Sequence, residues 1–218
     1  MTASRLKLRD KAYDNFTERL LNREIKPGQF VSQRELVEMT GITLGAIREL
    51  IPRLEAEGLI TTVPQRGMQV AHVDLNLIRN AYQFRLFLES QATAIFATTR
   101  SDATAAKLRW THEAIIRRAE AGETTTLIAD AQATDQALHE TIIDALDNDI
   151  ISKAFRVNWI KIKLIRHSES RLYSDLVIPV MRDHLRVIEA IERKDADAAV
   201  AAMTFHIGQA RNRAINMG

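Results

Sequence analysis

Apolar residues recur every three or four positions along most of this 218-residue chain, which is the spacing that places them on one face of a helix. The pattern changes character near residues 72–74. Before this point, short helical stretches alternate with glycine and proline; after it come long amphipathic stretches, interrupted by Gly122 and Pro179. We therefore predict an N-terminal domain over residues 1–73 and a C-terminal domain over residues 74–218.

The N-terminal pattern predicts three helices followed by a hairpin. Ser32 and Glu35 have the spacing of a capping box, and Gly41 tolerates the left-handed conformation that ends a helix. The third helix presents Leu44, Ile47, Ile51 and Leu54 as its apolar face. The predicted elements are a helix containing Ala12, Phe16, Leu20 and Leu21, a strand at Phe30–Val31, a helix from Ser32 to Gly41, a helix from Thr43 to Gly58, and strands over residues 59–63 and 68–71.

This order of elements is that of a winged helix-turn-helix domain, whose third helix fits the major groove of DNA. The predicted hairpin tip carries Gln65, Arg66 and Gly67, and a glycine lets the backbone approach a phosphate closely. The alternative is a small helical domain with a hairpin and no nucleic-acid partner. The pattern alone favours DNA binding only slightly.

The C-terminal pattern predicts about six helices. Asp74, Ser101 and Asp195 stand at positions suited to N-caps. Each helix has one apolar face, so the fold class is mainly α, with an N-terminal winged helix-turn-helix and a C-terminal all-α bundle. The predicted helices cover residues 74–99, 102–121, 125–146, 148–167, 171–193 and 195–216.

The composition limits the cellular compartment and the kinds of partner that we expect. The chain has no cysteine, which excludes disulfides and thiolate metal sites and suits a reducing cytoplasm. No apolar run is long enough to span a bilayer, so we expect no membrane partner. Residues 1–73 hold 11 Lys and Arg against 9 Asp and Glu, whereas residues 74–218 hold 19 of each. The net charge of +2 therefore lies in the N-terminal domain, where it agrees weakly with phosphate contact.

The N-terminal residues carry a family resemblance. Lys26–Leu36, Gly41–Thr43, Ile47–Glu49 and Arg53–Ile60 follow in the order and spacing of the GntR-family reading head, and Gln65–Gly67 with Val70 matches its wing. The resemblance covers nearly all of residues 9–71. It places five residues on the DNA-contacting positions of that family: Arg34, Thr43, Arg48, Arg66 and Gly67.

Three positions depart from the family pattern. Leu44 replaces an arginine, Gly45-Ala46 replaces a Thr-Pro pair, and Pro52 falls inside the third helix. The operator is therefore expected to differ from the common one, and Pro52 should bend the helix or end its regular hydrogen bonding. For Arg34 and Arg48 a surface salt bridge with a nearby glutamate is the alternative.

Four polar residues lie on apolar stripes of the C-terminal helices. Asp135 and His139 are one helical turn apart, on the face of Ala131 and Ile142. His184 and His206 lie on the apolar stripes of two later helices. One carboxylate and three imidazoles suit zinc, nickel or another divalent first-row metal.

Periodicity alone leaves these residues open to a second interpretation. A histidine on an apolar face is often a hydrogen-bonded core residue, and His112 lies on a similar stripe. Asp135–His139, His184–Ile191 and Asp195–His206 resemble the FadR-type effector domain called FCD, and the likeness covers most of residues 74–214. The resemblance implies a metal held by Asp135, His139, His184 and His206, with zinc the expected ion.

The same resemblance implies an effector site. Arg85 matches an arginine that often faces the pocket in this domain family, and the alternative for it is an i,i+4 salt bridge with Glu89. Asn158 is a further candidate for lining the pocket. A six-coordinate metal with four protein ligands keeps one or two positions free, so we expect a carboxylate effector to occupy them.

These observations predict a ligand-responsive transcription regulator, a repressor, that acts as a homodimer on a pseudo-palindromic double-stranded DNA operator. An alternative is a metal-dependent enzyme that uses the Asp/His site to activate water. Against an enzyme, no general base stands at a fixed spacing from the ligands. A helical adaptor without a ligand explains neither the polar cluster nor the wing.

Overall fold

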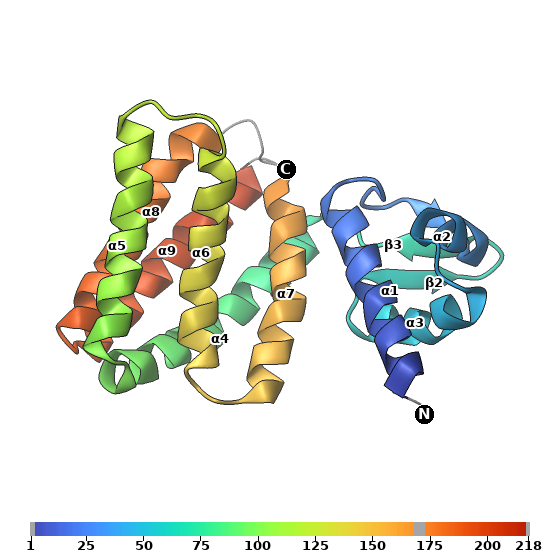
Figure 1. The fold of residues 1–218 in the computed structure, drawn as a ribbon, viewed down its shortest axis with the longest axis horizontal. Helices are drawn as coiled ribbons and strands as arrows, with labels where there is room; N and C mark the ends of the chain where they lie inside the picture. Colours follow the sequence, from blue (N-terminus) through green and yellow to red (C-terminus); the bar gives the residue numbers. More distant parts are fainter. Residues whose placement is uncertain (1–2, 168–172, 217–218) are drawn as a thin grey trace. The chain divides into compact units, whose positions relative to one another are not determined.

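In the computed structural model, which describes residues 3–167 and 173–216, helices dominate and the strands are confined to the N-terminal part (Figure 1). The described elements are α1 (Ala3–Leu21), β1 (Phe30–Val31), α2 (Gln33–Thr40), α3 (Leu44–Ala56), β2 (Ile60–Val63), β3 (Gly67–Val70), α4 (Leu75–Thr99), α5 (Asp102–Glu120), α6 (Leu127–Asp144), α7 (Asp149–His167), α8 (Tyr173–Glu192) and α9 (Ala196–Asn216). The predicted fold class, a winged helix-turn-helix followed by a helical bundle, is confirmed.

The chain forms two compact units. The first consists of the described parts of Met1–Leu77 together with Trp159–His167, and the second of the described parts of Ile78–Asn158 and Ser168–Gly218. Helix α7 thus contributes to both units.

The winged domain has a three-stranded antiparallel sheet in the order β1-β3-β2. Thr62 pairs with Met68 across the hairpin, and Phe30 pairs with Gln69. Beside the sheet, α1, α2 and α3 pack on one another. Their shared core is made of fully buried apolar side chains: Phe16, Leu20, Ile25, Leu36, Ile47, Leu50, Leu54 and Leu59.

The helix ends in this domain follow the predicted capping chemistry. Ser32 accepts from the Glu35 amide while the Glu35 carboxylate accepts from the Ser32 amide, which completes the capping box. Gly41 takes φ +66° at the end of α2, and the Thr43 side chain caps α3 by accepting from Ala46. These caps fix where α2 ends and where α3 begins.

The apolar face of α3 differs from the predicted one at its start. Leu44, in the first turn of α3, is 41 % exposed to solvent. Leu50 lies in the core instead, beside Ile47 and Leu54. Pro52 lies inside the helix, which continues beyond it to Ala56. The missing amide therefore does not end α3.

In the second unit, α8 packs against α5, α6 and α9, and α5 also packs against α6. The three predicted caps are present: Asp74, Ser101 and Asp195 each accept from a backbone amide three residues later. Apolar residues of α5, α6 and α8 meet in one buried cluster, formed by Ile115, Leu127, Ala131, Val177, Val180 and Met181. This packing turns the polar residues on the same stripes toward the interior.

Candidate metal centre and DNA-binding face

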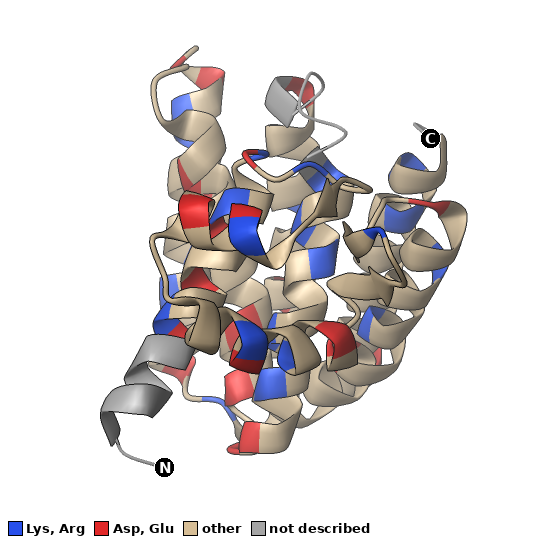
Figure 2. Ribbon diagram, turned by 90° about the vertical axis from the view of Figure 1, so that its right-hand side faces the viewer, with Lys and Arg blue, Asp and Glu red and all other residues tan. Residues whose placement is uncertain are grey.

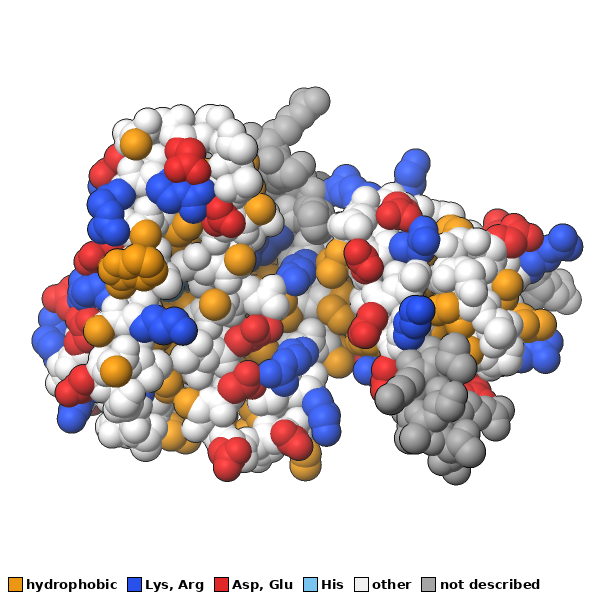
Figure 3. Space-filling model, viewed as in Figure 1, with side chains coloured by type: hydrophobic (Ala, Val, Ile, Leu, Met, Phe, Trp, Pro, Cys, Tyr) orange, Lys and Arg blue, Asp and Glu red, His pale blue; other side chains and the backbone are white. Residues whose placement is uncertain are grey.

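Three helices of the second unit bring one carboxylate and three imidazoles together. Asp135 and His139 come from successive turns of α6, His184 from α8 and His206 from α9, and one potential ligand atom of each lies within 4.8 Å of the others. All four side chains are buried; the most exposed residue, Asp135, is 3 % accessible. Almost no histidine surface appears on the face shown in Figure 3.

The distances within this Asp/His cluster suit one ion. The Nε2 atom of His184 lies 3.3 Å from Nε2 of His206 and 3.4 Å from Oδ1 of Asp135, and His139 Nε2 lies 3.9 Å from the same oxygen. Bonds of about 2.1 Å separate two ligand atoms by roughly 3.4 Å at the tetrahedral angle and 3.0 Å at a right angle. The four residues therefore fit a divalent first-row metal, which would supply a buried positive charge.

Burial keeps two of the imidazoles in the form that a metal needs. It lowers the pKa of His184 well below the usual value, and the nearby His206 lowers this pKa further. Burial likewise lowers the pKa of His206, with a further contribution from His139. A neutral imidazole has a lone pair to offer, so both rings are prepared to ligate without first losing a proton.

His112, on α5, contacts the cluster from outside. Its Nε2 atom lies 3.1 Å from Nδ1 of His184, and its own Nδ1 lies 2.7 Å from the backbone oxygen of Leu108. Periodicity alone cannot separate His112 from the other histidines, because it too lies on an apolar stripe. Its partner stands 72 residues later in the chain, which no local spacing reveals.

Arg85 and Glu89, on α4, contact the cluster from another side. Arg85 Nε donates to Glu89 Oε1 over 2.6 Å, and Glu89 Oε2 lies 2.6 Å from His139 Nδ1. Burial opposes ionisation of Glu89, but Arg85 and His139 outweigh it and lower the pKa of this carboxyl to about 2. The i,i+4 salt bridge considered for Arg85 is present, and it holds a carboxylate against a potential metal ligand.

Arg85 also lies close to the atom that would bind an ion. One of its terminal nitrogens is 3.1 Å from Nε2 of His139. Asn158, the other candidate effector residue, is buried on α7 and donates from its side-chain amide to the backbone oxygen of Ala81 on α4. The structure therefore gives Arg85 a contact with the Asp/His cluster, and Asn158 a contact that ties α7 to α4.

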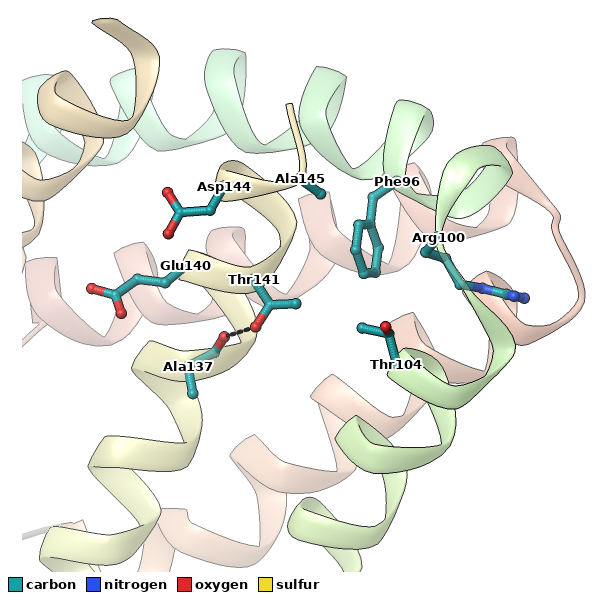
Figure 4. Close-up of a pocket in the computed structure, with 8 residues that line it drawn as sticks. All are labelled: Phe96, Arg100, Thr104, Ala137, Glu140, Thr141, Asp144 and Ala145. Atoms are coloured by element: carbon teal, nitrogen blue, oxygen red, sulfur yellow. Dashed lines mark hydrogen bonds between the residues drawn. The ribbon is translucent and has the colours of Figure 1, made fainter. Parts of the chain in front are cut away.

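A separate surface hollow of about 490 Å³ lies between the end of α4, the start of α5 and the second half of α6. In Figure 4, Phe96, Thr104 and Thr141 point into it, whereas the guanidinium of Arg100 points away. Arg100 donates instead to the backbone oxygens of Ile191 and Glu192. The residues that line this hollow do not include the Asp/His cluster: Phe96, Arg100, Thr104, Ala137, Glu140, Thr141, Asp144 and Ala145.

Three candidate DNA-contacting residues lie on α2, at the N-cap of α3 and on α3. Arg34, on α2, is highly exposed and forms an i,i+4 ion pair with Glu38 at 3.1 Å. Thr43 caps α3, and Arg48, on α3, donates to the side-chain oxygen of Gln33. Arg34 is thus paired with a glutamate, as its alternative interpretation holds, whereas Arg48 contacts a glutamine.

The wing carries the other two candidates. The guanidinium of Arg66 lies 5.2 Å from the ring centroid of Phe30, which is a cation–π contact. Gly67 takes φ +92°, and a Cβ there would stand 2.9 Å from the backbone oxygen of Val31. The fold itself requires this glycine. Basic and acidic residues are interspersed over the ribbon in Figure 2.

Comparison with known families accounts for both units. The model of the bacterial regulatory proteins of the GntR family matches residues 8–70, and the FCD domain model matches residues 80–209. This chain belongs to the GntR family and carries an FCD domain. It is therefore a DNA-binding transcription regulator, and its FCD domain is of a kind that binds small-molecule effectors.

Individual relatives agree with this assignment. The chain is 23 % identical to the Nta operon transcriptional regulator of Aminobacter aminovorans, over 84 % of this chain and 82 % of the relative. It is 25 % identical to the Uxu operon transcriptional regulator of Escherichia coli K12, over 83 % and 76 %. The solved structure of E. coli McbR/YncC has the same fold, with a TM-score of 0.74, 16 % identity and coverage of 99 % of both chains.

The comparisons bear on the alternatives left open by the sequence. The matched families and the named relatives are transcription regulators, which decides against a metal-dependent enzyme. Within the described part of this GntR-family chain, no helix is long and apolar enough to cross a membrane.

Proposed function

We propose that this GntR-family chain is a repressor whose affinity for its operator is set by a small carboxylate, bound near a zinc ion in the FCD domain. The ion would be held by Asp135, His139, His184 and His206. The observation that carries the proposal is the meeting of these four buried side chains within 4.8 Å. Burying an aspartate among apolar stripes is unfavourable unless a cation or hydrogen bonds compensate it.

The charges around the cluster support an anionic effector. Arg85 and a divalent ion would both be positive, close to the same atom of His139. With neutral imidazoles, the two buried carboxylates of Glu89 and Asp135 leave one net positive charge on the loaded site. A single carboxylate would neutralise it and could occupy a free position on the metal. Asn158 is retained as a second candidate for the effector pocket.

The proposed reading head follows from the family resemblance. We assign DNA contacts to Arg34, Thr43, Arg48, Arg66 and Gly67, in a domain that ends near residue 73. The FCD domain would begin at residue 74 and hold the dimer together. A homodimer presents two reading heads to the two halves of a pseudo-palindromic operator, and the effector would shift their spacing. Since the chromosome is its target, the protein would work in the cytoplasm.

Metal content tests the carrying observation directly. Protein purified without chelator or nickel resin should contain about one zinc per chain by elemental analysis, and chelation should lower its melting temperature. His206→Ala should abolish the bound zinc. If the parent protein contains no metal and chelator leaves its melting temperature unchanged, the cluster is not a metal site and its histidines are core residues.

Gel shift with DNA from upstream of the gene tests the reading head. Arg48→Ala and Arg66→Ala should each weaken operator binding by about 1–3 kcal/mol, which is roughly 5- to 150-fold. Arg117→Ala, at an exposed position on α5, is the matched control and should bind like the parent. Adding candidate carboxylates to the parent complex should release the DNA. Parent-like binding by both wing-domain variants would show that the DNA-binding face is wrongly assigned.

A further inference from the structure

The three imidazoles of the cluster differ in what holds the nitrogen that faces away from the ion. His139 has a carboxylate there, Glu89, at 2.6 Å. His184 has another imidazole, that of His112, at 3.1 Å. The corresponding Nδ1 atom of His206 is buried and has no hydrogen-bond partner within the described ranges 3–167 and 173–216. Only His184 is therefore held by a group that can itself accept or donate.

The direction of the hydrogen bonds follows from one fixed acceptor. The backbone oxygen of Leu108 can only accept, so the proton of His112 must be on Nδ1, 2.7 Å away. In a neutral ring this leaves the lone pair on Nε2, which accepts from Nδ1–H of His184. The lone pair of His184 is then on Nε2, the atom that faces Asp135 and His206.

We propose that His112 is a positioning residue of the metal centre, which fixes His184 as the tautomer whose Nε2 can bind an ion. This inference rests on the proposed metal site and extends it by one residue. His112 is fully buried and meets His184 edge-on, with ring centroids 5.2 Å apart and an interplanar angle of 75°. That geometry also fixes the ring plane of His184.

Without this acceptor, nothing would favour the tautomer of His184 that is protonated on Nδ1. A proton on Nε2 would block ligation, and the ring would be free to turn. Outer groups that hold metal-ligating histidines typically change metal affinity by about 10- to 100-fold when they are removed. His112 acts through His184 and would not touch the ion itself.

Zinc affinity, measured by competition with a chromophoric chelator, separates positioning from packing. His112→Phe keeps a buried ring but removes the acceptor, and its zinc dissociation constant should rise by about 10- to 100-fold. His112→Gln places an amide oxygen near the position of Nε2 and should recover binding to within about threefold of the parent. Ile115→Val, one turn along the same buried face of α5, should lower the melting temperature and leave zinc affinity unchanged.

Proton positions give a second measurement that does not depend on the stability of any variant. In zinc-loaded parent protein labelled with ¹⁵N-histidine, long-range proton–nitrogen spectra should find His112 and His184 both protonated at Nδ1. Protonation of His184 at Nε2 would overturn the proposal even if His112→Phe failed to fold.

The outcomes separate this inference from the proposed function. If the parent binds zinc and His112→Phe binds it equally well, the positioning role is wrong and the metal site stands. If His112→Gln binds as weakly as His112→Phe, the acceptor is not what matters, and the positioning role is again wrong. A parent that binds no divalent metal overturns both.

Discussion

Replacing Arg85 by methionine should destabilise the FCD domain strongly, because it leaves the buried carboxylate of Glu89 without its charged partner. Arg85 and Glu89 are 2 % and 1 % exposed, and two hydrogen bonds join them, at 2.6 and 3.3 Å. Methionine fills much of the same space but carries no charge. Among the described residues, Glu89 would keep its 2.6 Å contact with His139.

Breaking a buried ion pair by removing one partner typically costs about 3–5 kcal/mol. Because His139 remains beside Glu89, we expect the lower end of this range for Arg85→Met. For a domain the size of the FCD match, a loss of about 3 kcal/mol corresponds to a fall of roughly 10 °C in melting temperature. Arg85→Met/Glu89→Gln removes the stranded charge while leaving an acceptor for His139, and should regain more than half of that loss.

Scanning calorimetry of chelator-treated protein at pH 7 measures these effects on the full-length chain without a contribution from metal. A transition of Arg85→Met within about 3 °C of the parent would mean that Glu89 is not charged and buried as described. A double variant as unstable as the single one would point to lost packing instead. The double variant, if it retains zinc, then allows the effector response to be compared without Arg85.

Three further changes test other parts of the molecule. Gly67→Ala should destabilise the winged domain by about 1–3 kcal/mol in urea denaturation, because its Cβ meets the Val31 oxygen at φ +92°; Gly122→Ala shares a positive φ without a neighbour within 4 Å and should lose less. Arg109 lowers the pKa of Glu192 in the folded protein, so their pair stabilises above the unfolded pKa and is lost as the pH falls through the folded one. Glu192→Gln should therefore cost about 0.5 kcal/mol in urea at pH 7 and progressively less as the pH falls through the folded pKa, whereas an equal loss at every pH would contradict the ionic origin. Removing zinc present at about a hundred times its dissociation constant should cost about 2.7 kcal/mol, and an unchanged calorimetric transition would contradict binding to the folded state.

Helices and turns were predictable because their causes are local. The Ser32/Glu35 capping box and the left-handed Gly41 depend on a few neighbouring residues, and both are present. Leu44 was placed wrongly, since helical spacing cannot tell whether the first turn of α3 has reached the core. The same limit applies to Gly67, whose close neighbour Val31 is distant in sequence.

Helical spacing and the family resemblance predicted the four candidate ligands, but not the residues that surround them. Asp135 and His139 lie one helical turn apart, so their proximity follows from the sequence alone. That His184 joins them was implied by the family pattern, and the structure brings these residues together. The roles of Glu89 and His112 around the cluster depend on how α4 and α5 pack against α6 and α8, which no single-helix pattern contains.

The distribution of the four candidate ligands over three helices determines where the chain can change length without losing the proposed metal centre. Two of the four candidate ligands lie one turn apart on α6, and the others stand on α8 and α9, so none of the four lies in a connection between these helices. A residue inserted in a connection leaves each helix intact. One inserted within α9 ahead of His206 would advance that side chain by about 1.5 Å and rotate it by about 100°. Insertions and deletions that preserve the site should therefore be confined to the connections, and those within α6, α8 or α9 should mark relatives that have abandoned it.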